Sequence, residues 1–138
     1  MKNWIALAAV CVVAVAGLTA CGGGDSKEDA RASAIGALSE NAVDAWSQNG
    51  AAGLHSFFTQ SVLARCSVDQ LETALSGQPK PTAWRNTKDF KFSTEGQATA
   101  TVIVVSNGQD VPQTWTFELE ANTRWRVLDL PGLSECHG

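Results

Sequence analysis

Apolar side chains recur along this chain with two different spacings, one in each half. Between residues 30 and 46 they recur every three or four positions, which is the spacing of one face of a helix. The members of this stripe are Ala30, Ala34, Ala37, Leu38, Ala42, Ala45 and Trp46. Two overlapping capping patterns, Asp25/Glu28 and Ser26/Asp29, predict where this helix begins. Gly50 predicts where it ends, because glycine readily adopts the left-handed conformation found at helix C-termini.

Two shorter helices are predicted after Gly50. The first holds the apolar residues Leu54, Phe57, Phe58, Val62 and Leu63. The second begins at Ser67, a residue type that caps helix N-termini, and its inward-facing residues are Leu71, Ala74 and Leu75. The run Gly77-Gln78-Pro79-Lys80-Pro81 interrupts the helical spacing and predicts a loop.

In the last third of the chain the apolar positions alternate, which is the pattern of strands. Asn107-Gly108 is the strongest hairpin signal in the chain and predicts a type I′ turn. Folding the chain there places Ala100 opposite Trp115 and Ala98 opposite Phe117. Small apolar residues therefore face large ones on one side of the sheet, and threonines face threonines on the other.

A three-residue loop at residues 121–123 gives the next pair of strands matching residues on both faces of the sheet. It sets Leu119 against Trp125 on the apolar face and Glu120 against Arg124 on the other. A two-residue loop would set Glu120 against Trp125, so we reject that register. An earlier loop brings a further strand alongside, and the predicted sheet is a four-stranded antiparallel meander with one apolar face.

The fold class that follows is α+β, with N-terminal helices packed on a curved four-stranded meander. The helical stripe has to cover the apolar face of the sheet, because an exposed apolar patch of that size would aggregate. Two polar residues, Gln113 and Asp129, interrupt that face. In the predicted register Asp129 faces Trp115, where a carboxylate beside an indole could act as an acid or a base. The alternative is that Asp129 marks the point at which the last strand leaves the core.

The first 21 residues have the pattern of an export signal. Lys2 supplies a positive charge, and the run from Trp4 to Leu18 contains no charged residue. This run is too short to cross a bilayer, for which about 20 residues are needed, and it has the length of a signal-peptide core. It leads directly into the sequence Leu18-Thr19-Ala20-Cys21.

These residues resemble a bacterial lipoprotein signal with a lipobox. The resemblance implies cleavage before Cys21 and attachment of a diacylglyceryl group to its thiol, so that acyl chains such as palmitate hold the protein on the cell membrane or outer membrane, outside the cytoplasm. It implies a signal peptide over residues 1–20, a lipidated cysteine with a short Gly-rich tether over 21–28, and a single α+β domain over 29–138. An uncleaved anchor, or an ordinary signal peptide with an incidental cysteine, stays open.

Composition narrows the class of protein further. Lys and Arg number 10 against 14 Asp and Glu, and the formal net charge of -4 disfavours nucleic acid, which basic surfaces bind. Hydrophobic residues make up 44% and charged residues 17%, which is typical of a globular chain. Processing would remove Lys2 and no acidic residue, so the mature chain would be more acidic still and would depend on its lipid for membrane attachment.

Cys66 and Cys136 are expected to form a disulfide, since both would remain after export to an oxidising compartment. The bond would close a loop of about 70 residues and stabilise the domain by roughly 4 kcal/mol in the loop-entropy description. A zinc site built from these two cysteines, His55 and His137 is the alternative, but the adjacent Cys136 and His137 have poor ligand spacing. No metal and no cofactor are expected.

The order of helices followed by a meander that ends in Trp125-Arg126-Val127 resembles the nuclear transport factor 2-like, or cystatin-like cone, superfamily. A tryptophan in the first helix and a Gly-rich hairpin tip add to the likeness, which covers residues 29–130. The resemblance implies a cone of helices and sheet that holds a small apolar ligand, and an outer sheet face that pairs two copies of the chain. The residues expected at the mouth of the cone are Trp46, His55, Trp84, Gln113, Trp115 and Asp129.

Enzymes of that superfamily, such as ketosteroid isomerase and scytalone dehydratase, use a pocket tyrosine together with Asp or His. This chain has no tyrosine. It also lacks a Ser-His-Asp order, a phosphate-binding glycine loop and an HExxH pattern. We therefore expect no catalytic residues, and a membrane-anchored, non-enzymatic domain that binds a small ligand or an envelope protein. A small-molecule isomerase or dehydratase of the same fold, and a structural cell-envelope subunit, are the alternatives.

Overall fold

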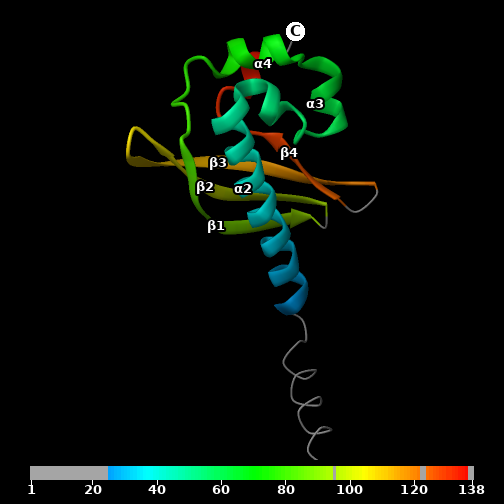
Figure 1. The fold of residues 1–138 in the computed structure, drawn as a ribbon. Coiled ribbons are helices and arrows are strands. Elements are labelled where there is room, and N and C mark those ends of the chain that lie inside the picture. Colours follow the sequence, from blue (N-terminus) through cyan, green and yellow to red (C-terminus); the bar gives the residue numbers. More distant parts are fainter. Residues whose placement is uncertain (1–24, 95, 122–123, 137–138) are drawn as a thin grey trace, which may run out of the picture. The chain divides into compact units, whose positions relative to one another are not determined.

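The computed structural model describes residues 25–94, 96–121 and 124–136, and its fold is α+β, with helices followed by an antiparallel sheet (Figure 1). The elements are α2 (Asp25–His55), α3 (Gln60–Arg65), α4 (Val68–Leu75), β1 (Ala83–Thr94), β2 (Gln97–Ser106), β3 (Gln109–Glu120), β4 (Arg124–Asp129) and the 3-10 helix η1 (Leu133–Cys136). The packing below is that of residues 33–138, which form one compact unit. The predicted signal peptide and Cys21 lie outside the described residues.

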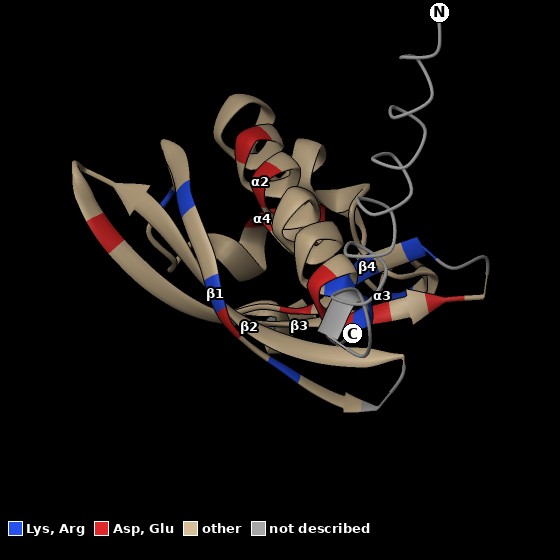
Figure 2. Cartoon of the chain, turned by 90° about the horizontal axis from the view of Figure 1, so that it is seen from below, with Lys and Arg blue, Asp and Glu red and all other residues tan. Residues whose placement is uncertain are grey.

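From residue 33 onward, α2 lies over one face of the four-stranded sheet, with α3 and α4 on the same side (Figure 1, Figure 2). The sheet contributes Val102, Trp115 and Phe117 to the core, and α2 contributes Val43 and Leu54. All five of these side chains are 0% exposed. The helices therefore cover the apolar face of the sheet, as the alternation of its residues predicts.

The buried face of α2 differs from the predicted stripe. Ile35, Ser39 and Ala42 are buried, whereas Ala34 and Ala37 are exposed. Ser39 can be buried because its hydroxyl donates a hydrogen bond to the carbonyl oxygen of Ile35 at 2.7 Å. The spacing of apolar residues therefore does not identify the buried face of α2. One buried residue is a serine, and alanine is compatible with either side of a helix.

Two predicted helix boundaries are confirmed. Gly50 kinks α2 with a φ of 65°, and the residues from there to His55 form a short further turn of helix. Ser67 caps α4, where its hydroxyl accepts a hydrogen bond from the backbone N–H of Gln70 at 3.2 Å. The Gln70 side chain in turn accepts from the backbone N–H of Ser67 at 2.8 Å, which completes a capping box. Leu71, Ala74 and Leu75 are buried as predicted.

The prediction of one helix over residues 54–63 is wrong, because α2 ends at His55 and α3 begins at Gln60. Phe58 instead forms a parallel bridge with Val127 of β4. The backbone N–H of Thr59 donates to the Val127 carbonyl at 3.0 Å, and the Val127 N–H donates to the Phe57 carbonyl at 2.9 Å. β4 is an edge strand whose backbone groups need partners, so this pairing overrides the helical spacing of the two phenylalanines.

The sheet has the order β1-β2-β3-β4, with neighbouring strands antiparallel. Asn107 and Gly108 have φ values of 52° and 75°, both positive as a type I′ turn requires. The predicted register across this turn is confirmed. The register of β3 against β4 is confirmed as well, with Leu119 opposite Trp125.

The first strand is longer than the alternation of its residues indicates. It begins at Ala83, which pairs with Val105 of β2. The first half of β1 is polar and its apolar residues do not alternate, so the sequence pattern did not reveal this part of the strand. A bulge then sets Asp89 and Phe90 against Ala100, and Asp89 adopts a φ of 55°. Bulges of this kind blunt an edge strand against pairing with other chains.

A second irregularity moves Asp129 away from its predicted position. The register of β3 and β4 shifts between Thr116 and Phe117, so that Asp129 pairs with Thr116. Asp129 is exposed. The prediction that it faces Trp115 is therefore wrong, because the extra residue in β4 turns the carboxylate out of the core.

Candidate functional site

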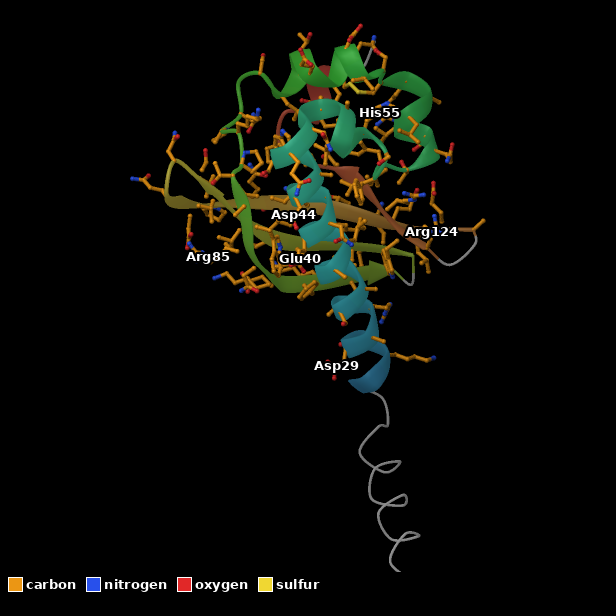
Figure 3. The ribbon with its side chains drawn as sticks, viewed as in Figure 1. Asp29, Glu40, Asp44, His55, Arg85 and Arg124 are labelled. Atoms are coloured by element: carbon orange, nitrogen blue, oxygen red, sulfur yellow. A yellow bond between two sulfur atoms is a disulfide. The ribbon has the colours of Figure 1, made fainter. Side chains whose placement is uncertain are left out.

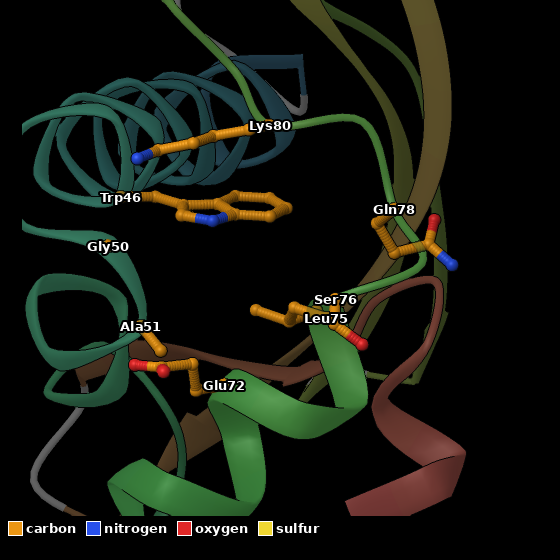
Figure 4. Close-up of a pocket in the computed structure, with 8 residues that line it drawn as sticks. All are labelled: Trp46, Gly50, Ala51, Glu72, Leu75, Ser76, Gln78 and Lys80. Atoms are coloured by element: carbon orange, nitrogen blue, oxygen red, sulfur yellow. The ribbon is translucent and has the colours of Figure 1, made fainter.

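A cavity of about 270 Å³ lies where the kink of α2, the last turn of α4 and the loop after α4 meet (Figure 4). Its lining residues are Trp46, Gly50, Ala51, Glu72, Leu75, Ser76, Gln78 and Lys80. In Figure 4 the Trp46 indole closes one side of the space, and Leu75 and Ala51 lie across from it. The cavity is therefore an apolar slot with polar groups around its rim.

Local structure accounts for how these residues meet. The positive φ of Gly50 turns the chain after Trp46 and brings Ala51 to the cavity wall. Glu72, Leu75 and Ser76 are spaced by three and four residues, which places them on one face of a helix. Leu75 is 6% exposed and lies inward on that face.

The loop after α4 is held by backbone hydrogen bonds at both ends. The N–H of Gln78 donates to the carbonyl of Leu75 at 2.9 Å, and the N–H of Thr82 donates to the carbonyl of Val105 at 2.7 Å. The Lys80 carbonyl accepts a hydrogen bond from the Ser106 hydroxyl at 2.8 Å. These bonds fix the path of the loop, and Figure 4 shows the Lys80 side chain running beside the indole of Trp46.

The indole N–H of Trp46 has no hydrogen-bond partner among the described residues, although Trp46 is only 4% exposed. Two other tryptophans differ in this respect. The Trp84 N–H donates to the Thr87 hydroxyl at 2.9 Å, and the Trp115 N–H donates to the Gln113 side-chain oxygen at 2.8 Å. In Figure 4 the nitrogen of Trp46 faces the open space of the cavity. This nitrogen is accessible from the cavity, so an acceptor that enters the cavity could bind it directly.

Two opposite charges stand on the rim of the cavity. Glu72 and Lys80 are both exposed. Within the described part of the chain neither side chain takes part in an ion pair or a hydrogen bond; the ion pairs found there are Arg85–Asp110 at 3.0 Å and Arg126–Glu120 at 3.8 Å. Both rim charges are therefore free to bind a ligand.

Of the six residues predicted for the mouth of a cone, Trp46 alone lines this cavity. Gln113 and Trp115 are buried in the sheet, where the Trp115 N–H donates to the Gln113 side-chain oxygen. Trp84 is engaged with Thr87. The structure therefore does not assemble these residues into one site.

The other two predicted pocket residues lie elsewhere. His55, labelled in Figure 3, donates a hydrogen bond from Nε2 to the carbonyl oxygen of Cys66 at 2.7 Å. Asp129 is exposed on the last strand. The predicted pairing of Asp129 with an indole in an apolar pocket is thus absent.

Sequence reasoning missed Glu72, Ser76, Gln78 and Lys80 as cavity residues. Two of them belong to the Gly- and Pro-rich loop, and loops on a rigid scaffold often carry binding residues. Composition marked this loop only as a break in the helical pattern. Its position beside Trp46 depends on contacts between distant segments, which no local spacing encodes.

Cys66 and Cys136 form a disulfide, with Cα atoms 5.5 Å apart, within the usual range for such a bond. Cys66 is 1% and Cys136 2% exposed. His55 contacts the backbone of Cys66 rather than its sulfur. No cluster of three or more potential metal ligands occurs in the described residues, which do not include His137.

None of the helices in the described residues has the length and apolarity needed to cross a bilayer. Cys21 lies outside those residues, so the lipid anchor stays a prediction. In comparisons with known proteins, no family model, no curated protein and no solved structure matches this chain.

Proposed function

We propose that this chain is a lipid-anchored, extracytoplasmic binding domain that takes a small ligand into the cavity beside Trp46. The observation that carries the binding function is the Trp46 indole, which lines the cavity and turns toward it an N–H that lacks a partner among the described residues. A donor placed in this way is typical of the few polar groups that orient a ligand in an otherwise apolar site.

The proposed location rests on two independent features. The sequence from Trp4 to Cys21 resembles a lipoprotein signal, and a diacylglyceryl group would anchor the chain durably. The disulfide between Cys66 and Cys136 supports export, because such bonds persist outside reducing compartments. The acidic net charge of -4 gives the domain no attraction of its own for anionic lipid.

A binding role is favoured over catalysis by the groups around the cavity. Glu72 and Lys80 are its titratable lining residues, and both are exposed on the rim. Acid–base catalysis commonly uses paired titratable groups in environments that separate their pKa values. An isomerase or dehydratase of the cone type would need Asp129 or His55 inside a cavity, and neither lines this one.

A surface role in the envelope, or pairing of two copies through the outer sheet face, has less support. The outer face presents cross-strand threonine pairs, Thr99 with Thr116 and Thr101 with Thr114. Polar pairs of this kind are compatible with a solvated face. We therefore place the proposed activity in the cavity rather than on the sheet.

The lipid anchor predicts covalent labelling at one cysteine. In cells fed radiolabelled palmitate, we expect the wild-type protein to carry the label and to sediment with membranes. The Cys21→Ala variant should lose both the label and the membrane association, because the acceptor thiol is gone. Immunoprecipitation followed by autoradiography measures the label.

Cys11→Ala provides the matched control, since Cys11 lies in the leader that processing would remove. This variant should be labelled like the wild type. An unlabelled wild-type protein, or label that persists in Cys21→Ala, would contradict the proposed anchor.

A further inference from the structure

We infer that the cavity beside Trp46 binds a small quaternary ammonium compound, held between the indole ring and the carboxylate of Glu72. This inference rests on the proposed ligand-binding function and adds the chemical class of the ligand. Its basis is an aromatic ring and a carboxylate that line the same cavity from two different helices, α2 and α4.

The indole ring has one side open to the cavity. In Figure 4 it lies between Lys80 on one side and Glu72, Ala51 and Leu75 on the other. Trp46 is 4% exposed, so most of this ring is shielded from water. Cations are attracted to the face of an aromatic ring, most strongly to that of tryptophan, and the attraction grows when water is removed. A cation in the cavity is therefore favoured on the side of the ring away from Lys80.

Glu72 supplies the charge opposite to that of the ligand. Its carboxylate lines the cavity and has no ion pair among the described residues, where the ion pairs are Arg85–Asp110 and Arg126–Glu120. Glu72 is exposed, so water screens its charge and its own contribution to binding is small. The ring and the carboxylate together favour a cation over a neutral molecule of the same shape.

The walls of the cavity select the kind of cation. Ala51 and Leu75 lie across from the indole and are each 6% exposed. The N–H groups of a primary ammonium would lack acceptors against these side chains, and a buried donor without an acceptor is costly. A quaternary ammonium has no N–H, and its methyl groups can pack against apolar walls. The volume of about 270 Å³ suits a small molecule, since pockets for drug-sized ligands begin at ~300 Å³.

Two further charge effects act on a cation in opposite directions. The net charge of -4 attracts cations to the protein at long range. Lys80 opposes them, because its ammonium is positive and Figure 4 places its side chain along the far side of the indole. A cation in the cavity should therefore bind more tightly once Lys80 is neutralised, whereas a bound anion would be weakened by the same change.

The test follows the indole N–H signal of Trp46 by NMR in the ¹⁵N-labelled gene product, extracted from membranes in a nonionic detergent or taken from the soluble fraction if it is found there. The signal is assigned by its loss in Trp46→Phe. The probes are choline, 3,3-dimethylbutan-1-ol, which has the same shape without the charge, and benzyl alcohol, a neutral aromatic molecule. Sodium chloride keeps the ionic strength equal in all titrations.

We expect choline to shift the Trp46 signal to saturation. The uncharged 3,3-dimethylbutan-1-ol should bind about tenfold more weakly, which is within the range of cation–π attraction at a shielded ring. The indole signals of Trp84, Trp115 and Trp125 should stay in place, because these residues do not line the cavity.

A fourth probe, the short-chain lipid dihexanoylphosphatidylcholine, distinguishes the source of the quaternary ammonium group. A shift of the Trp46 signal like that caused by choline would identify a lipid headgroup as a ligand. A shift caused by choline and not by this lipid would identify a free compound.

Charge-neutral variants then assign the two charges beside the ring. Glu72→Gln should lower the preference for choline over 3,3-dimethylbutan-1-ol about threefold, as the loss of an exposed charge pair does. Lys80→Gln should raise that preference about twofold, because a like charge across the ring is removed. Glu40→Gln and Lys88→Gln neutralise exposed residues that do not line the cavity, and they should leave the preference unchanged.

Two different failures can be distinguished. If choline binds no more tightly than 3,3-dimethylbutan-1-ol, if Glu72→Gln keeps the full preference, or if benzyl alcohol alone shifts the Trp46 signal, the cavity binds ligands but the quaternary ammonium assignment is overturned. If no probe shifts the signal, both the assignment and the cavity as a binding site are overturned.

Discussion

We expect the Cys66→Ala/Cys136→Ala double variant to lose roughly 4 kcal/mol of unfolding free energy relative to the oxidised wild type. The disulfide joins residues 70 positions apart, so its removal returns a large conformational freedom to the unfolded chain. It also releases η1, which packs Leu133 at 1% exposure and ends at Cys136. Urea titration followed by circular dichroism measures the difference.

Reduction of the wild type separates the loss of the bond from the loss of packing that the two alanine substitutions cause. With a reductant present, the wild type should fall to nearly the stability of the double variant, and the double variant should not respond. Equal stabilities of the wild type with and without reductant would show that the chain does not depend on this bond. The result bears on location as well, since a domain that needs the disulfide needs an oxidising compartment.

We expect Gly53→Ala to cost about 2–3 kcal/mol, because the added methyl group has no space. A Cβ atom at Gly53 would collide with the carbonyl oxygen of Ala45 and would lie 2.9 Å from the Cβ of Asn49. The carbonyl belongs to helical backbone, so relief requires the chain after the Gly50 kink to move. The same movement would displace Ala51 from the cavity wall. Thermal unfolding and ligand titration of the variant measure the two effects.

Gly36→Ala is the matched control for this substitution. A Cβ atom at Gly36 meets nothing within 4 Å, and Gly36 lies in the same helix. The control should gain roughly 0.5–1 kcal/mol, as alanine does over glycine in a helix interior. If Gly53→Ala were as stable as Gly36→Ala, the close approach of the two segments around the kink would be wrong.

Much of the fold could be predicted from the sequence because neighbouring residues decide it. Asn107-Gly108 dictates a turn with two positive φ values, and that turn sets the register of ten residues on either side of it. Ser67 and Gln70 cap α4 through contacts within a single turn. The charge and size of the residues that face each other in β3 and β4 then determined the length predicted for the loop between these strands.

The errors arose where distant segments decide the structure. Phe58 has the spacing of a helical residue, but the open edge of β4 captures its backbone. Asp129 leaves the core because of a bulge, and one extra residue exchanges the two faces of a strand. The cavity has the same origin, since it needs the Gly50 kink, α4 and the loop with Lys80 to meet.

The intact mass of the protein extracted from its native membrane shows whether the mature protein is a lipidated domain closed by one disulfide. Under non-reducing conditions the predicted mass is that of residues 21–138 with a diacylglyceryl group, and with two hydrogens fewer for the bond between Cys66 and Cys136. A mass that includes the leader, or one that corresponds to an unmodified Cys21, would show that the protein is not a lipoprotein anchored at this cysteine.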